Sequence, residues 1–169
     1  DLTEGMVKFL GTVYPKKILT SPVTGKKCVY YSYYVYRMTG SGKHRKTIRL
    51  AEGSTTDPIL LFDRTGMVRV DLKDAFYGFK PQVLQGRAIT ESIADDIAYY
   101  LKKNMIIVDT FTDFDNLQVM ERVIEPERPL CIYGKATLDP EPTEKNQRLI
   151  ISNTGVIGNL NVFESEEDM

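Results

Sequence analysis

Short runs of β-branched, aliphatic and aromatic residues, separated by turn-forming residues, recur along most of this sequence. Each run has the length of a strand, and most are bounded by Gly, Pro, Asp or Ser, which favour turns. We therefore predict strands at 5–15, 28–37, 47–52, 117–124, 129–139 and 148–152, and a β-hairpin over 58–75.

One segment has the periodicity of a helix instead. In residues 90–104, Thr90 can cap the first turn, and Ile93, Ile97 and Leu101 recur every four residues. The pattern as a whole predicts a mainly β fold with one or two helices, arranged as an OB-like or related β-barrel, closed or partly open.

The length of the chain is that of about one domain. We predict a single β-rich domain over residues 1–163, with a helical insertion at 80–116. Residues 164–169 form an acidic tail that we expect to be disordered.

Five of the ten tyrosines lie between residues 30 and 36. Alternation along a strand places Tyr31 and Tyr33 on one face, and Tyr30, Tyr34 and Tyr36 on the other. A platform for stacking nucleic-acid bases needs its rings on one exposed face. Aromatic residues on both faces favour a strand that has a core on one side and a second covering layer on the other.

The composition is that of a soluble globular protein, with 42% hydrophobic and 27% charged residues. Residues 1–50 contain ten Lys/Arg but only two Asp/Glu. The segment 39–46 has the glycines of an exposed hairpin tip and carries four adjacent basic residues. These are Lys43, His44, Arg45 and Lys46. We consider this tip a candidate site for an anionic surface, with lipid headgroups or a nucleic acid as the alternatives.

Side chains for catalysis or metal binding are scarce. His44 is the only histidine, and its basic, turn-like surroundings indicate a solvated loop rather than a catalytic site. Cys28 and Cys131 together with one histidine cannot supply the four ligands of a structural zinc site. Both cysteines lie in apolar runs, so we expect buried thiols, with a disulfide between them left open. The sequence thus predicts no catalytic residue, no metal and no cofactor in this chain.

A longer motif begins at residue 21 with a turn and continues into the tyrosine-rich strand. It reads SPVTGKKCVYY, and its informative positions are Ser21, Pro22, Thr24, Gly25, Cys28, Val29, Tyr30 and Tyr31. This motif resembles the signature of the GIDE-type domain, also called the BAM ("beside a membrane") domain. The family includes Mulan-like membrane-anchored RING E3 ubiquitin ligases and their archaeal and bacterial relatives.

Two further motifs occur in the family's order. The hairpin at 58–75 resembles a family motif through Asp63, Thr65 and Gly66. The segment 121–136 resembles another through Glu121 and Gly134. The sequence departs from the family pattern at three positions, with Ile59 in place of Phe, Leu72 in place of Pro and Glu127 in place of Gly. Residues 80–116 match no family motif.

The resemblance implies a non-catalytic interaction or regulatory domain, held next to a membrane by flanking transmembrane helices outside this chain. The motif residues would be structural, and the partner would be an unidentified protein at the membrane, with anionic lipid headgroups as a second ligand. Ubiquitin transfer by the ligase members belongs to a separate RING domain, so an E3 function could not be assigned to this chain. An OB-type module for single-stranded nucleic acid is the alternative, which the distribution of the tyrosines disfavours.

Overall fold

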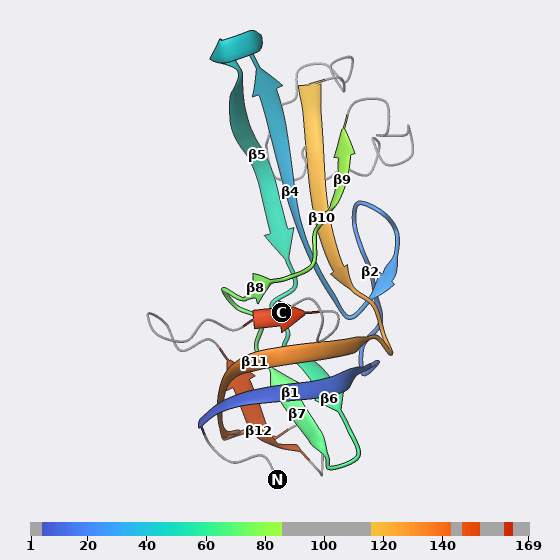
Figure 1. Ribbon diagram of the computed structural model, residues 1–169. Helices are drawn as coiled ribbons and strands as arrows, with labels where there is room; N and C mark the ends of the chain where they lie inside the picture. Colours follow the sequence, from blue (N-terminus) through green and yellow to red (C-terminus); the bar gives the residue numbers. More distant parts are fainter. Residues whose placement is uncertain (1–4, 86–115, 143–146, 153–160, 164–169) are drawn as a thin grey trace. The chain divides into compact units, whose positions relative to one another are not determined.

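The computed structural model describes residues 5–85, 116–142, 147–152 and 161–163, which form mostly β-strands (Figure 1). Their contacts group the chain into two compact units. Unit 1 comprises residues 1–19, 56–80 and 124–169, and unit 2 comprises residues 20–55 and 81–123.

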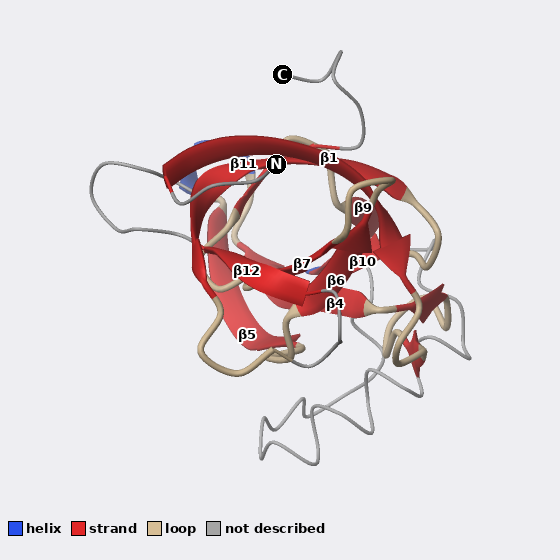
Figure 2. Ribbon diagram, turned by 90° about the horizontal axis from the view of Figure 1, so that it is seen from below, coloured by secondary structure: helices blue, strands red, loops and turns tan. Residues whose placement is uncertain are grey.

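Five strands of unit 1 close into a β-barrel. Around the barrel their order is β1-β6-β7-β12-β11, and β11 pairs again with β1. Figure 2 shows this ring from one end. The strands are β1 (Gly5–Tyr14), β6 (Ile59–Phe62), β7 (Met67–Val70), β11 (Pro129–Leu138) and β12 (Gln147–Ser152).

The order of these strands is that of an OB fold. Numbered along the chain, the strands follow one another around the barrel as first, second, third, fifth and fourth, and the third and fifth (β7 and β12) are parallel. The other pairings between barrel strands are antiparallel. The prediction of an OB-like β-barrel is therefore confirmed. Two short strands, β13 (Asn161–Phe163) and β8 (Phe76–Tyr77), extend the sheet from β11.

Alternation along β1 produces the barrel interior. Phe9 and Val13 are buried, whereas Lys8, Leu10 and Tyr14 are exposed. Strands β1 and β11 keep a continuous register through Gly11. Its role is steric, because a Cβ on Gly11 would lie 2.4 Å from the Phe9 ring. A side chain there would force the ring to move.

Unit 2 is built around a four-stranded sheet with the order β5-β4-β10-β9. Its strands are β4 (Tyr30–Thr39), β5 (Lys46–Ser54), β9 (Gln82–Gln85) and β10 (Leu117–Ile124). A separate two-stranded ladder, β2 (Leu19–Thr20) with β3 (Lys27–Cys28), flanks the turn of the first motif. Strands β4 and β5 form a long hairpin that the 3-10 helix η1 (Gly42–His44) closes at its tip (Figure 1).

The tyrosines of β4 lie on both faces of this sheet, as predicted. Tyr33 is 2% exposed and belongs to a buried cluster, against which Tyr31 packs. The other members of the cluster are Val23, Val35, Leu117 and Val119. On the opposite face, Tyr34 and Tyr36 are half-buried and stack on each other with ring centroids 6.1 Å apart.

Gly53 of β5 pairs directly with Tyr33 of β4. A Cβ on Gly53 would lie 2.5 Å from the hydroxyl oxygen of Tyr33 and 2.6 Å from its ring. Because Gly53 has no side chain, the Tyr33 ring can occupy the space next to β5 at this position. Such packing of an aromatic ring compensates for the low stability that glycine gives to a strand.

The sequence predicted one domain over residues 1–163, and the structure groups the chain into two units. The contacts form two groups because two connections of the barrel are long and contain strands of their own. The connection from β1 to β6 carries β4 and β5, and the connection from β7 to β11 carries β9 and β10. The predicted helix at 90–104 and the tail at 164–169 lie outside the described residues. Of the predicted insertion at 80–116, residues 82–85 form β9.

We predict that Tyr33→Ala destabilises unit 2 by about 3–5 kcal/mol, the usual cost of truncating a buried aromatic residue. Tyr36→Ala is the matched control on the half-buried face and should cost less than about 2 kcal/mol. Urea denaturation followed by tyrosine fluorescence measures both. Equal midpoints for the two variants would contradict the assignment of Tyr33 to the core.

Candidate functional site

The turn of the first motif closes around a buried carboxylate. Glu121 of β10 is 2% exposed and faces the turn formed by residues 21–25. Backbone N–H groups of Val23 and Thr24 donate hydrogen bonds to its two oxygens at 3.1 Å each. The hydroxyl of Ser21 donates at 3.2 Å, and the hydroxyl of Thr24 donates a further, short bond.

The turn itself is shaped by its own residues. The N–H of Gly25 donates to the carbonyl of Ser21 at 3.1 Å, and the N–H of Lys26 donates to the Ser21 hydroxyl at 3.1 Å. Gly25 has a φ of 66°, which glycine adopts without steric cost. Pro22, at the second turn position, restricts φ to a value that suits the turn. Every polar residue of this motif therefore has a structural partner.

The structure joins two motifs that are about a hundred residues apart in the sequence. Ser21 and Thr24 belong to the first motif, and Glu121 belongs to the last. Because the carboxylate oxygens accept four hydrogen bonds and are shielded from solvent, they are engaged in holding the turn rather than available as a general base. In the sequence, Glu121 is marked only as one position of the third motif, and no local pattern identifies it as a site residue.

The Asp63 turn is a second structural device, between β6 and β7. Asp63 Oδ1 accepts hydrogen bonds from the N–H of Thr65 at 2.7 Å, its hydroxyl at 2.7 Å, and the N–H of Gly66 at 3.0 Å. The predicted hairpin at 58–75 is thereby confirmed. Partial burial raises the pKa of Asp63, but the hydrogen bonds from Thr65 and Gly66 outweigh this effect and lower it below its ordinary value of 3.8.

The remaining motif residues are also placed by packing. Cys28 and Cys131 are both buried free thiols, as expected. Tyr30 is buried, and Gly134 is buried on β11 opposite Val7 of β1. Glu127 has a φ of 62°, a left-handed conformation that glycine adopts more readily than any other residue.

The surface that binds nucleic acids in many OB folds is formed by the second and third strands and by two loops, one between the first and second strands and one between the fourth and fifth. In this chain the first of these loops is the β1–β6 connection, which carries β4 and β5. Arg69 of β7 lies on that surface and is paired with the carboxylate of Asp139 at 2.7 Å. The Asp139 side chain is fully buried, and Arg69 also donates to the carbonyl of Glu141 at 3.2 Å. The charge of Arg69 is thus neutralised by Asp139, which is unfavourable for a contact between Arg69 and a phosphate backbone.

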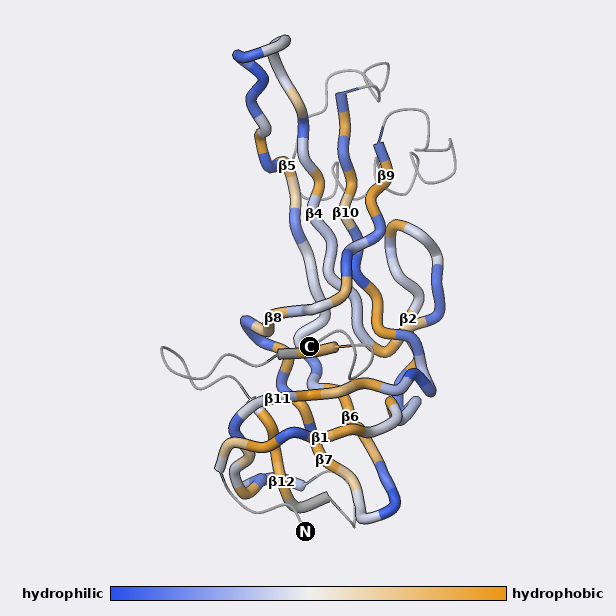
Figure 3. Tube along the Cα trace, viewed as in Figure 1, coloured by the Kyte–Doolittle hydropathy of each residue, from blue (hydrophilic) through white to orange (hydrophobic). Residues whose placement is uncertain are grey.

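The basic residues predicted as a candidate site are gathered at the tip of the β4–β5 hairpin. Lys43 and His44 lie in η1, and Arg45 and Lys46 follow directly. All four side chains are exposed. The tip appears as one of the strongly hydrophilic segments of the chain in Figure 3. From Arg37 to Ala51, both included, the sequence contains five Lys/Arg and no Asp or Glu.

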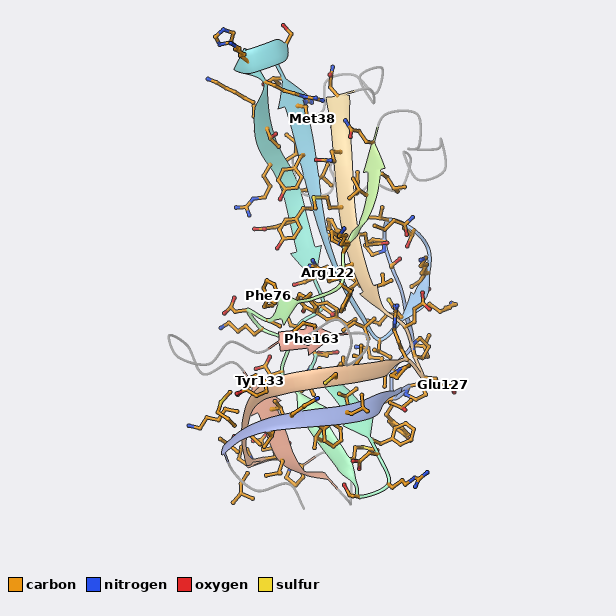
Figure 4. The ribbon with its side chains drawn as sticks, in the orientation of Figure 1. Met38, Phe76, Arg122, Glu127, Tyr133 and Phe163 are labelled. Carbon is orange, nitrogen blue, oxygen red and sulfur yellow. The ribbon has the colours of Figure 1, made fainter. Side chains whose placement is uncertain are left out.

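One contact holds the tip against its own strand. Arg45 Nη2 lies 3.0 Å from the sulfur of Met38, which is buried near the end of β4 (Figure 4). Gln85 of β9 approaches the same sulfur at 3.8 Å. The base of the tip is therefore packed, whereas Lys43, His44 and Lys46 project into solvent.

Comparisons with known proteins identify no relative. No protein-family model, no curated protein and no solved structure matches this chain. Among the residues that the structure describes, no group of three His, Cys, Asp or Glu side chains could hold a metal ion. In the same described ranges, no helix has the length and hydrophobicity that a membrane span requires.

We predict that Glu121→Gln destabilises unit 2 by about 2–4 kcal/mol. The amide group of Gln would direct N–H donors at the N–H donors of the turn, and charge-assisted hydrogen bonds would be lost. Ser21→Ala removes a single partner and should cost about 1 kcal/mol. Chemical denaturation ranks the two variants, and a Glu121→Gln variant as stable as the native protein would contradict the proposed role of the carboxylate.

The lowered pKa of Asp63 predicts the pH dependence of the hairpin. A carboxylate with a lower pKa in the folded state stabilises that state fully above its unfolded pKa of about 3.9. This contribution is lost as the pH falls through the lower folded value. Stability measured from pH 6 to pH 2 should therefore fall less in Asp63→Asn than in the native protein, and parallel curves would contradict the assignment.

Proposed function

We propose that this chain is a non-catalytic interaction module that works beside a membrane, like the GIDE-type domain it resembles, and that its basic hairpin tip docks on anionic lipid headgroups. The observation that carries the proposal is the tip itself. Lys43, His44, Arg45 and Lys46 lie together in solvent at the end of a long hairpin, without an acidic residue in the adjoining sequence.

Two structural features support the resemblance on which the membrane location rests. The first and last family motifs meet in one hydrogen-bonded unit at Glu121. Glu127 has the left-handed backbone conformation that suits the family's Gly. Both agree with a shared fold in which the motif residues are structural, so the interaction would be made by other, exposed residues.

The physical argument for lipid is electrostatic. Each Lys or Arg near an anionic membrane surface contributes about 1 kcal/mol of attraction. Three fully charged residues at the tip, Lys43, Arg45 and Lys46, would together contribute about 3 kcal/mol. That is weak for a free protein, but a module tethered at the membrane would have a high effective concentration there.

Single-stranded nucleic acid is the competing ligand for the same cations. Two observations make it the weaker candidate. Arg69 on the usual OB binding face is paired with Asp139. The buried cluster holds Tyr33, so the tyrosines do not present their rings together on one open face.

We expect the protein to sediment with phosphatidylcholine vesicles that contain phosphatidylserine, and not with pure phosphatidylcholine vesicles. Reversal of the three tip charges, K43E/R45E/K46E, should weaken the binding by about 100-fold, which corresponds to about 3 kcal/mol. K73E/K80E/K135E is the matched control, because it makes the same charge change at exposed sites of unit 1.

The proposal is contradicted if sedimentation is independent of the anionic lipid, or if the two triple variants lose binding equally. Tighter binding of a single-stranded oligonucleotide than of the vesicles would favour the nucleic-acid alternative. Extraction of the native full-length protein with alkaline carbonate tests the membrane location separately. A protein that stays in the membrane fraction supports it, and release into the soluble fraction opposes it.

A further inference from the structure

The outer edge of β5 is open among the strands that the structure describes. In the sheet order β5-β4-β10-β9, β5 is a terminal strand whose described partner is β4. Its first four residues, Lys46–Arg49, are all exposed. A terminal strand presents N–H and C=O groups on its free side, and these can pair with an added strand.

The geometry of this edge is regular where it is exposed. Residues 46–49 of β5 pair with residues 36–39 of β4 in continuous register. The register shifts only beyond this stretch, between Val35 and Tyr36 of β4. Leu50 of β5 is the extra residue at this bulge. Strand β5 contains no proline that would interrupt a new ladder. The half of β5 nearest the tip is therefore competent to accept a partner strand.

Charge determines which partner fits. Lys46 and Arg49 lie on the edge strand, where Arg49 also forms an exposed ion pair with Glu52 at 2.9 Å, and Lys43 and Arg45 lie at the adjoining tip. Cations on an edge strand oppose pairing with a second copy of the same edge, because like charges would meet. The same cations attract an acidic strand. The positive charge of this edge therefore disfavours self-association and favours an acidic partner.

An apolar contact is also available. Ile48 is 49% exposed and lies between these cations along the strand. In β-strand addition, main-chain hydrogen bonds supply affinity, and alternate side chains supply specificity. Alternation places Lys46 and Ile48 on one face of β5, and Thr47 and Arg49 on the other. An extended segment with apolar residues on the Ile48 face and carboxylates on the Arg49 face would match this edge.

We infer that the β5 edge at Lys46–Arg49 binds an extended acidic segment of a partner protein by strand addition. The inference names a protein partner for the interaction role proposed above and rests on that role. It does not need lipid binding, since the backbone edge and the tip side chains are different parts of the hairpin. Failure of the vesicle experiment would leave it intact.

Two peptides of about ten residues separate strand addition from simple charge attraction. One alternates Glu and Val, and the other has the same number of Glu with two of the Val replaced by Pro. Both have the same net charge, but only the first can form a continuous ladder. We expect the alternating peptide to bind roughly tenfold tighter, with the largest NMR shifts at the amides of residues 46–49.

Equal affinities would mean that the cations act only as charges, and this would overturn the inference. Failure of both peptides to bind at low salt would overturn it as well. Neither result would bear on lipid docking, which the vesicles test independently.

Two neighbouring substitutions give an internal control. In an antiparallel ladder, the N–H groups of adjacent residues point to opposite edges, so one of Thr47 and Ile48 faces β4 and the other faces outward. Thr47→Pro and Ile48→Pro should therefore differ, since one disrupts the hairpin and the other keeps the fold by circular dichroism. The folded variant should lose the preference for the alternating peptide. If it keeps that preference, the inference is overturned, and if neither variant folds, the peptide pair alone decides.

Discussion

The hydrogen bonds to the Glu121 carboxylate are the interaction on which the organisation of unit 2 depends. They connect a turn at residues 21–25 with a strand about a hundred residues later in the sequence. These segments belong to two different connections of the barrel, and each must find the other for the sheet to form. Burial of a carboxylate is costly unless its hydrogen bonds are complete, and here the turn supplies four. The arrangement therefore favours one pairing of β10 with the turn over any other.

This constraint separates structural from functional polar groups. The buried carboxylates of Glu121 and Asp139 are held by hydrogen bonds and an ion pair, and Asp63 organises its own turn. These three carboxylates therefore stabilise the fold. The exposed cations at the tip of the β4–β5 hairpin form a cluster of charged groups that is available to a partner. This hairpin is supported by the Tyr33 cluster on one face and by the stacked Tyr34 and Tyr36 on the other. The proposed functions follow from that division.

Much of the fold could be predicted from the sequence because its signals are local. Alternation predicted β1, and turn chemistry predicted the hairpin around Asp63. The i, i+2 pattern placed Tyr31 and Tyr33 on one face of β4, and the structure confirms each of these. The basic tip followed from composition alone. These predictions needed only residues that are close together in the chain.

The long-range features could not be predicted in the same way. The alternation of β10 places Glu121 on the same face as Leu117 and Val119, a position where an apolar residue would be expected. Its burial makes physical sense only once Ser21 and Thr24 are beside it, and no local pattern reveals that. The division into two units likewise depends on pairings between the two barrel connections.

The central claim is that the Glu121 carboxylate locks the turn to the sheet. Amide hydrogen exchange at Val23 and Thr24 tests it most directly, because these N–H groups lie in a turn but donate to a buried oxygen. The account predicts that both amides exchange as slowly as those at the centre of β10, and that Glu121→Gln accelerates them selectively. Exchange at the rate of an exposed turn in the native protein would contradict the claim.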